Sequence, residues 1–85
     1  MTFSVQLGNR AEKALKRMSA NDAARIARAL RDMSDDPLSG DIVKLKGTEA
    51  YRRRVGDYRI LFAVDFLQRA VAVLDILRRT TTTYR

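Results

Sequence analysis

The sequence predicts a small α+β domain in which two helices lie on one face of a curved antiparallel sheet. Two observations lead to this fold class. Residues 10–33 hold two stretches with helical periodicity, and residues 42–77 hold four stretches typical of strands, separated by turn signals. The chain has 85 residues, which suits one domain with a simple core. The predicted order is β-α-α-β-β-β-β: an N-terminal strand, a two-helix hairpin and a four-stranded antiparallel sheet, all in a single domain over residues 1–85.

Residues 2–7 alternate apolar and polar side chains, which predicts the first strand, and Gly8 ends it. Asn9 is a good N-cap for the first helix, and Asn21 or Asp22 for the second. Each helix has one apolar stripe. The two stripes are Ala11, Ala14, Leu15 and Met18, then Ala23, Ile26, Ala27, Leu30 and Met33. Pro37 ends the second helix, because the residue before a proline disfavours helical geometry.

The second half of the chain predicts strands at 42–45, 50–55, 58–64 and 70–77. Gly47 marks one turn, and Gly56-Asp57 marks a tight hairpin turn. The stretch 70–77 is apolar apart from Asp75, as in a central strand. Threonines at 80–83 favour extended backbone and predict a last short strand or an ordered edge. Since each helix has one apolar face, both should cover the same face of the sheet and leave the other free.

The composition excludes several classes of function. The chain has no cysteine and no histidine, which excludes disulfides and removes the commonest zinc ligand and the commonest general base. Its carboxylates are scattered and no glycine-rich phosphate loop is present, so we expect no metal and no cofactor. No stretch approaches the roughly 20 apolar residues that span a bilayer, and no signal peptide is evident. We therefore expect a cytoplasmic protein that does not bind a membrane.

The excess positive charge lies in two segments. The formal net charge is +7, from 17 Lys and Arg against 10 Asp and Glu. Residues 44–59 hold six basic and two acidic residues, residues 78–85 hold three basic residues and no acid, and the rest of the chain is balanced. Such clustering indicates a polyanionic partner. The alternative is a generally basic, solvated surface.

Three arginines of the predicted hairpin should share one face of the sheet. In a strand, successive side chains point to opposite faces, so Arg52 and Arg54 lie together, and Arg59 returns close to them after the turn. Arg53 lies on the opposite face, but its long side chain can reach solvent past the sheet edge. Guanidinium groups bind phosphate oxygens in bidentate geometry, which indicates that a phosphate binds there. The alternative is an ordinary exposed hairpin whose arginines pair with nearby acids.

Further RNA contacts are predicted on both sides of this hairpin. Lys44 and Lys46 occupy alternate positions and extend the basic patch. The C-terminal segment adds Arg78, Arg79 and Arg85, together with Tyr84. An aromatic ring beside a basic groove can stack on an unpaired base. The alternative for Tyr84 is packing against the edge of the core.

The stretch 44–60 resembles the RelE/ParE superfamily of bacterial and archaeal toxins. The resemblance rests on Lys-Leu-Lys-Gly at 44–47, on the tyrosine and basic residues at 51–54, and on Val-Gly-Asp-Tyr-Arg at 55–59. The helical hairpin that ends in Asp-Pro, and the basic tail with its late tyrosine, extend the likeness over the whole chain. The resemblance implies a RelE-like fold and the toxin of a type II toxin–antitoxin system. It implies three partners: a cognate antitoxin, the ribosome and messenger RNA. It also allows a toxin–antitoxin heterotetramer.

RelE-type toxins cut messenger RNA in the ribosomal A site by attack of a 2′-hydroxyl on the adjacent phosphate. The resemblance then implies a catalytic role for five residues. Arg52 and Arg54 match basic residues that assist base catalysis, and Arg59 matches the arginine that holds the scissile phosphate. Arg78, or Arg79 in its place, matches a basic residue that acts as acid or charge stabiliser, and Tyr84 matches a tyrosine that stacks on the cleaved nucleotide.

Two departures from the family pattern weaken the catalytic prediction. The residues at 52 and 54 are lysines in a well-studied branch, and many relatives have a histidine just before the tail arginine. Arginine is a poor general base but stabilises a pentavalent phosphorane well, so catalysis here should be electrostatic and positional. The alternatives are a ParE-like inhibitor of DNA gyrase and a catalytically inactive RNA-binding member.

Overall fold

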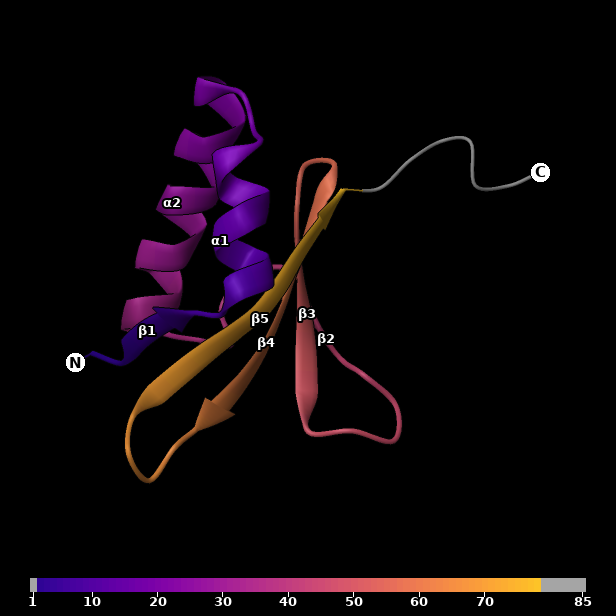
Figure 1. Ribbon diagram of the computed structural model, residues 1–85. Helices are drawn as coiled ribbons and strands as arrows, with labels where there is room; N and C mark the ends of the chain where they lie inside the picture. The colour runs from indigo at the N-terminus through magenta and orange to yellow at the C-terminus, as the bar shows by residue number, and fades with distance from the viewer. Residues whose placement is uncertain (1, 79–85) are drawn as a thin grey trace.

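The computed structural model describes residues 2–78 (Figure 1). Its elements follow the predicted order: β1 (Ser4–Leu7), α1 (Asn9–Lys16), α2 (Ala20–Asp35), β2 (Ile42–Lys44), β3 (Ala50–Val55), β4 (Tyr58–Asp65) and β5 (Ala70–Arg78). The α+β fold class is therefore confirmed. The predicted threonine strand at 80–83 lies outside the described residues. None of the described helices is long and apolar enough to cross a membrane.

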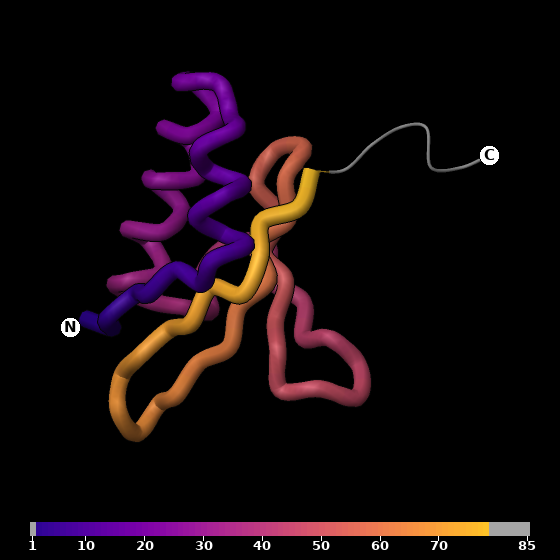
Figure 2. The backbone as a smooth tube through the Cα atoms, viewed as in Figure 1, coloured from indigo at the N-terminus to yellow at the C-terminus, as the bar shows by residue number. Residues whose placement is uncertain are grey.

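The five strands form one sheet in the order β1-β5-β4-β3-β2. Strands β2 to β5 pair antiparallel, as predicted, whereas β1 joins the sheet parallel to β5 (Figure 2). The register aligns Ser4 with Ala70 and Leu7 with Val73. A parallel neighbour needs a long connection, and the two helices lie within it. The first strand thus pairs with the strand most distant from it in the described chain.

Both helices lie on the same side of the sheet, as predicted (Figure 1). The buried core contains the large side chains that are fully enclosed between the helices and the sheet: Ile26, Met33, Ile60, Phe62, Val71 and Val73. In β4, Ile60 and Phe62 face this core because alternate residues of a strand share a face. Within residues 2–78, no helix covers the other face of the sheet. Side chains that point there are free to contact a ligand.

The helix caps differ from the predicted ones. Gly8, rather than Asn9, is the N-cap of α1, and Ser19, rather than Asn21 or Asp22, is the N-cap of α2. The Ser19 hydroxyl accepts a hydrogen bond from the backbone N–H of Asp22, at 3.2 Å. This bond satisfies an amide of the first turn that has no partner within the helix. The end of α2 at Asp35, just before Pro37, agrees with the prediction.

Candidate nucleic-acid interface

Three of the predicted arginines share the helix-free face of the sheet. In β3, Tyr51 and Arg53 point towards the helices, so alternation places Arg52 and Arg54 on the other face. The strand register sets Arg54 directly opposite Arg59 of β4. Side chains in such a pair have Cβ atoms about 5 Å apart. We call Arg52, Arg54 and Arg59, whose side chains leave the backbone on this same face, the sheet arginines.

Most of the charge of the sheet arginines is uncompensated. The Nε atom of Arg54 is 3.9 Å from an Asp41 carboxylate oxygen, and both side chains are at least half exposed. An ion pair at such an exposed site contributes little. Within residues 2–78, the side chains of Arg52 and Arg59 have no hydrogen-bond or ion-pair partner. Unpaired guanidiniums on one open surface suit a ligand with several phosphates.

Apolar side chains lie between the sheet arginines. Arg52 is opposite Val43 of β2 on one side and Leu61 of β4 on the other, and Arg59 is opposite Leu77 of β5. Val43 and Leu77 are 45% and 44% exposed. A surface that alternates cations with apolar groups can bind a phosphate backbone and also pack against unstacked bases.

Arg53 does not belong to this surface, and the prediction that its side chain reaches solvent past the sheet edge is wrong. Its side chain is only 10% exposed and lies on the helix side of the sheet. The guanidinium donates a hydrogen bond to the Ser39 carbonyl at 3.1 Å and lies 3.6 Å from an Asp32 carboxylate oxygen. Gly40, with φ of +91°, lies so close that a Cβ there would meet the guanidinium. Arg53 therefore ties the loop after α2 to β3 instead of reaching solvent past the sheet edge.

The two lysines are also separated from the sheet arginines, contrary to the prediction. Lys44 is opposite Tyr51, whose side chain faces the helices, whereas its neighbour Val43 takes the position beside Arg52. Lys46 lies in the loop that joins β2 to β3. This loop ends at Ala50, where β3 begins. Ala50 lies about 16 Å along β3 from Val55, after which the hairpin turn begins. The lysines thus lie near the opposite end of the hairpin from Arg54 and Arg59.

Arg78 lies at the same end of the sheet as Arg54 and Arg59, but on the helix side. It is opposite Tyr58 in the register, and its guanidinium carbon lies 5.9 Å from the centroid of the Tyr58 ring. A groove of about 430 Å³ runs between α1 and β5 here. The cations that line it are Arg10, Lys13, Arg17 and Arg78. Arg78 therefore does not join the sheet arginines on their face, and the predicted residues Arg79, Tyr84 and Arg85 lie outside the described residues.

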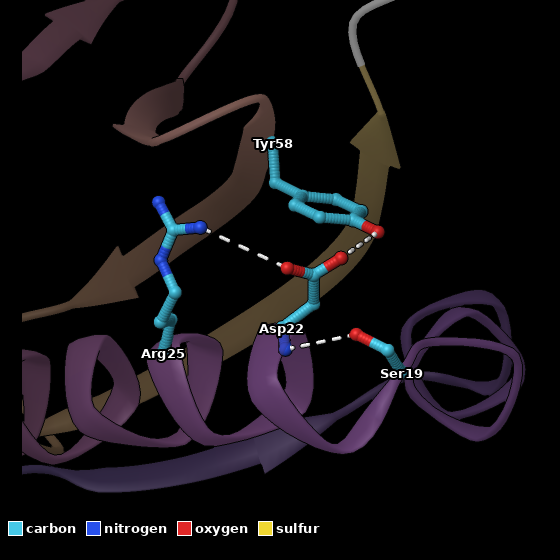
Figure 3. A network of polar contacts seen from close by, with 4 residues as sticks. All are labelled: Ser19, Asp22, Arg25 and Tyr58. Atoms are coloured by element: carbon cyan, nitrogen blue, oxygen red, sulfur yellow. Dashed lines mark hydrogen bonds and ion pairs between the residues drawn. The ribbon is translucent and has the colours of Figure 1, made fainter.

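A polar network joins the first turn of α2 to the start of β4 (Figure 3). The Tyr58 hydroxyl donates a hydrogen bond to one carboxylate oxygen of Asp22, at 3.1 Å, and the other oxygen lies 3.7 Å from Arg25. Burial raises the pKa of Tyr58 above its usual value of 10.0, and the bond to Asp22 adds to this shift. Both effects favour the neutral phenol. The network fixes the hairpin turn, and with it Arg54 and Arg59, against the helical layer.

Replacing Tyr58 by phenylalanine should lower the free energy of unfolding by about 1 kcal/mol at neutral pH, because one hydrogen bond is lost. The stabilisation by the phenol is fully present below pH 10, where Tyr58 is protonated in both states. Above pH 10 the unfolded chain loses its proton first, so this stabilisation is lost as pH rises towards the folded pKa. Urea unfolding of both proteins from pH 7 to pH 11 measures the difference. A constant difference over that range would contradict the assignment.

No functional role was predicted for Arg25 or Arg28 of α2. In the structure, Arg25 lies against Gly56 in the β3–β4 turn, where a Cβ would collide with its guanidinium. Gly56 also has φ of +58°, a conformation that glycine adopts without strain. No local pattern signals this approach, because Arg25 and Gly56 belong to different layers of the fold.

The chain matches a known family over most of its length. Residues 5–82 match the family described as ParE toxin of type II toxin-antitoxin system, parDE. A protein of Methanocaldococcus jannaschii named as toxin RelE1 is 29% identical over 83 residues, which cover 93% of this chain and 92% of that protein.

Two solved structures of toxin–antitoxin complexes have a similar fold. One chain of the archaeal RelE–RelB complex from Pyrococcus horikoshii OT3 is 26% identical, with a TM-score of 0.85 over 96% of this chain and 100% of that chain. One chain of the RelB–RelE complex from Methanococcus jannaschii is also 26% identical, with a TM-score of 0.69 over 85% of this chain and 87% of that chain. These similarities agree with the resemblance noted in the sequence.

Proposed function

Because the chain belongs to the ParE toxin family of type II toxin–antitoxin systems, we propose that it inhibits translation as a ribosome-dependent endoribonuclease of the RelE type. The observation that carries this proposal is that Arg52, Arg54 and Arg59 share one helix-free face, where two of them have no partner within the described residues. RNA cleavage needs such a site for the scissile phosphate. The relative named toxin RelE1 supports the same choice within the family.

The reaction is a displacement at phosphorus that uses the RNA's own nucleophile. The 2′-oxygen forms a bond to the adjacent phosphorus, the bond to the 5′-oxygen breaks, and a cyclic phosphate and a free 5′-hydroxyl result. The 2′-hydroxyl gives its proton to a water molecule, and the leaving 5′-oxygen takes a proton from another water molecule. The pentavalent intermediate carries extra negative charge, which the sheet arginines stabilise more strongly than they stabilise the substrate. The reaction as proposed requires no metal ion.

The arginines supply charge and position rather than proton abstraction. A guanidinium stays protonated at any physiological pH and cannot act as the general base. We assign Arg59 to the scissile phosphate and Arg52 and Arg54 to the oxygens around it, with the ribosome orienting the 2′-hydroxyl. Tyr84 would stack on the cleaved nucleotide. Because Arg78 lies on the helix side of the sheet, we assign the stabilisation of the leaving oxygen to Arg79, the alternative that the resemblance allowed.

We further propose that a cognate antitoxin neutralises the toxin in the cytoplasm. The structural neighbours from Pyrococcus horikoshii and Methanococcus jannaschii are complexes of RelE with RelB. An antitoxin that covers the sheet arginines would block access to RNA. A heterotetramer of two toxins and two antitoxins is the assembly that we propose for this pair.

Inhibition of DNA gyrase is the second candidate function, and the description of the matching family as ParE toxin favours it. Two assays on the purified protein separate the candidates. Primer extension on messenger RNA from translating ribosomes detects cuts in the A site, and a supercoiling assay detects gyrase inhibition. We expect A-site cuts and unchanged supercoiling. Loss of supercoiling without any cuts would refute the proposal in favour of gyrase inhibition, and a protein inactive in both assays would refute an enzymatic role.

A further inference from the structure

A second cationic groove lies between α2 and the edge of β3. Its volume is about 360 Å³, and small apolar side chains form part of its wall. Four guanidinium groups and one carboxylate line it: Arg25, Arg28, Arg53, Arg54 and Asp32. We call this the α2 groove. The positive charge of its walls indicates an anionic ligand.

The α2 groove opens where the edge strand stops. Strand β2 begins at Ile42, which is opposite Arg53, and the preceding Asp41 accepts a hydrogen bond from the Arg54 N–H at 3.0 Å. Beyond that point no described strand pairs with β3 on this side. Arg54 lies at the boundary, because alternation assigns it to the sheet arginines and it also lines the α2 groove. The two cationic surfaces are therefore continuous around the edge of β3.

The charges in the α2 groove are unequally compensated. Asp32 is 3.6 Å from the buried Arg53, so the only carboxylate of the groove already has a partner. Arg25 pairs with Asp22 at 3.7 Å, but its side chain is 57% exposed, and such a pair is weak. Arg28 is exposed and has no hydrogen-bond or ion-pair partner in the part of the chain that the structure describes. Arg28 is thus the cation of the groove that is most available to a ligand.

We propose that the α2 groove binds a second backbone phosphate of the RNA whose scissile phosphate lies on the sheet arginines. This inference rests on the proposed function and extends its site from the sheet to α2. Phosphates recur along an RNA strand, so one strand that crosses the edge of β3 at Arg54 can reach both surfaces. Arg25 and Arg28 would contact the phosphate, and their guanidinium forks fit its oxygens.

Binding of a non-cleavable RNA to the full-length protein tests this proposal. The probe is a fluorescent 2′-O-methyl oligoribonucleotide of about ten nucleotides, within the range that single-strand sites cover. Its dissociation constant is measured by anisotropy at several salt concentrations. We expect Arg28→Ala to weaken binding by roughly three- to tenfold and to lower the salt slope by about 0.7, the value for one phosphate contact on a single strand.

Arg31 of α2 provides the matched control. It is exposed on the same helix and has the same charge, but it does not line the α2 groove. We expect Arg31→Ala to bind like the wild type, which would separate a local contact from the effect of net charge. Arg28→Lys should recover part of the affinity. Thermal unfolding should be unchanged in all three variants, since neither residue has an intramolecular partner among those described.

The outcomes separate this inference from the proposed function. Equal affinities and slopes for Arg28→Ala and Arg31→Ala would overturn the α2 groove as a phosphate site, whether or not the wild type cuts messenger RNA. The converse result is that Arg28→Ala lowers the salt slope as expected while the wild type fails to cut messenger RNA. That result would support the groove as a phosphate site and overturn only the enzymatic role. A parallel titration with polyglutamate tests whether the groove binds an acidic protein segment instead of RNA. If Arg28→Ala weakened binding of polyglutamate but not of RNA, the groove would be a protein site and the inference would be wrong.

Discussion

Replacing Arg59 by alanine is expected to lower ribosome-dependent cleavage of messenger RNA by about 10²–10³-fold, the usual effect of removing one donor that stabilises an anionic intermediate. Arg59 is opposite Arg54 on the helix-free face, and its side chain has no partner within residues 2–78. Its guanidinium is therefore available to the scissile phosphate. Primer extension over a time course with translating ribosomes gives the rate.

Two variants control for loss of folding and for loss of charge. Arg59→Lys keeps the charge but not the planar fork, so its rate should fall between those of the wild type and Arg59→Ala. Arg31→Ala removes an exposed arginine on the helix side and should cut at the wild-type rate. A rate for Arg59→Ala within a few-fold of the wild type would show that Arg59 does not hold the reacting phosphate.

Replacing Phe62 by alanine should have the largest effect on stability, a loss of about 3–5 kcal/mol in the free energy of unfolding. Phe62 is fully buried, and its ring stacks on Tyr51 with 5.5 Å between centroids. The substitution removes apolar contacts and leaves a cavity between the sheet and the helices. A domain of this size is stable by only about 5–15 kcal/mol, so the substitution would remove a large fraction of the total stability. Urea unfolding followed by circular dichroism measures the change.

Phe66 allows the same substitution at an exposed position. It lies after β4 and is 55% exposed, with only an edge-to-face contact to Phe3 at 5.9 Å. Phe66→Ala should therefore cost about 1 kcal/mol or less. If the two alanine variants unfolded at the same urea concentration, the core assigned to the helix side of the sheet would be wrong.

The sequence was sufficient to predict the strands and helices because each has its own periodicity. Alternation over residues 58–64 placed Ile60 and Phe62 on the buried face, and the same rule placed Arg52 and Arg54 on the open face. A two-residue turn at Gly56-Asp57 then fixed the position of Arg59. The centre of the proposed site therefore follows from local rules.

Features that depend on contacts between layers could not be read from these patterns. Alternation placed Arg53 on the helix side, but the sequence does not reveal that Asp32 and the Ser39 carbonyl hold its guanidinium there. The positions of Lys44 and Lys46 depend on the register between β2 and β3, which the short strand did not reveal. The approach of Arg25 to Gly56 depends on how α2 crosses the sheet.

The parallel pairing of β1 with β5 has a consequence for the order of folding during synthesis. Strand β1 leaves the ribosome first, whereas β5, its only neighbour in the sheet, leaves after every other described element. Contacts between distant segments form late because the chain between them must first be ordered. A growing polypeptide therefore cannot complete its sheet until residues 70–73 have emerged.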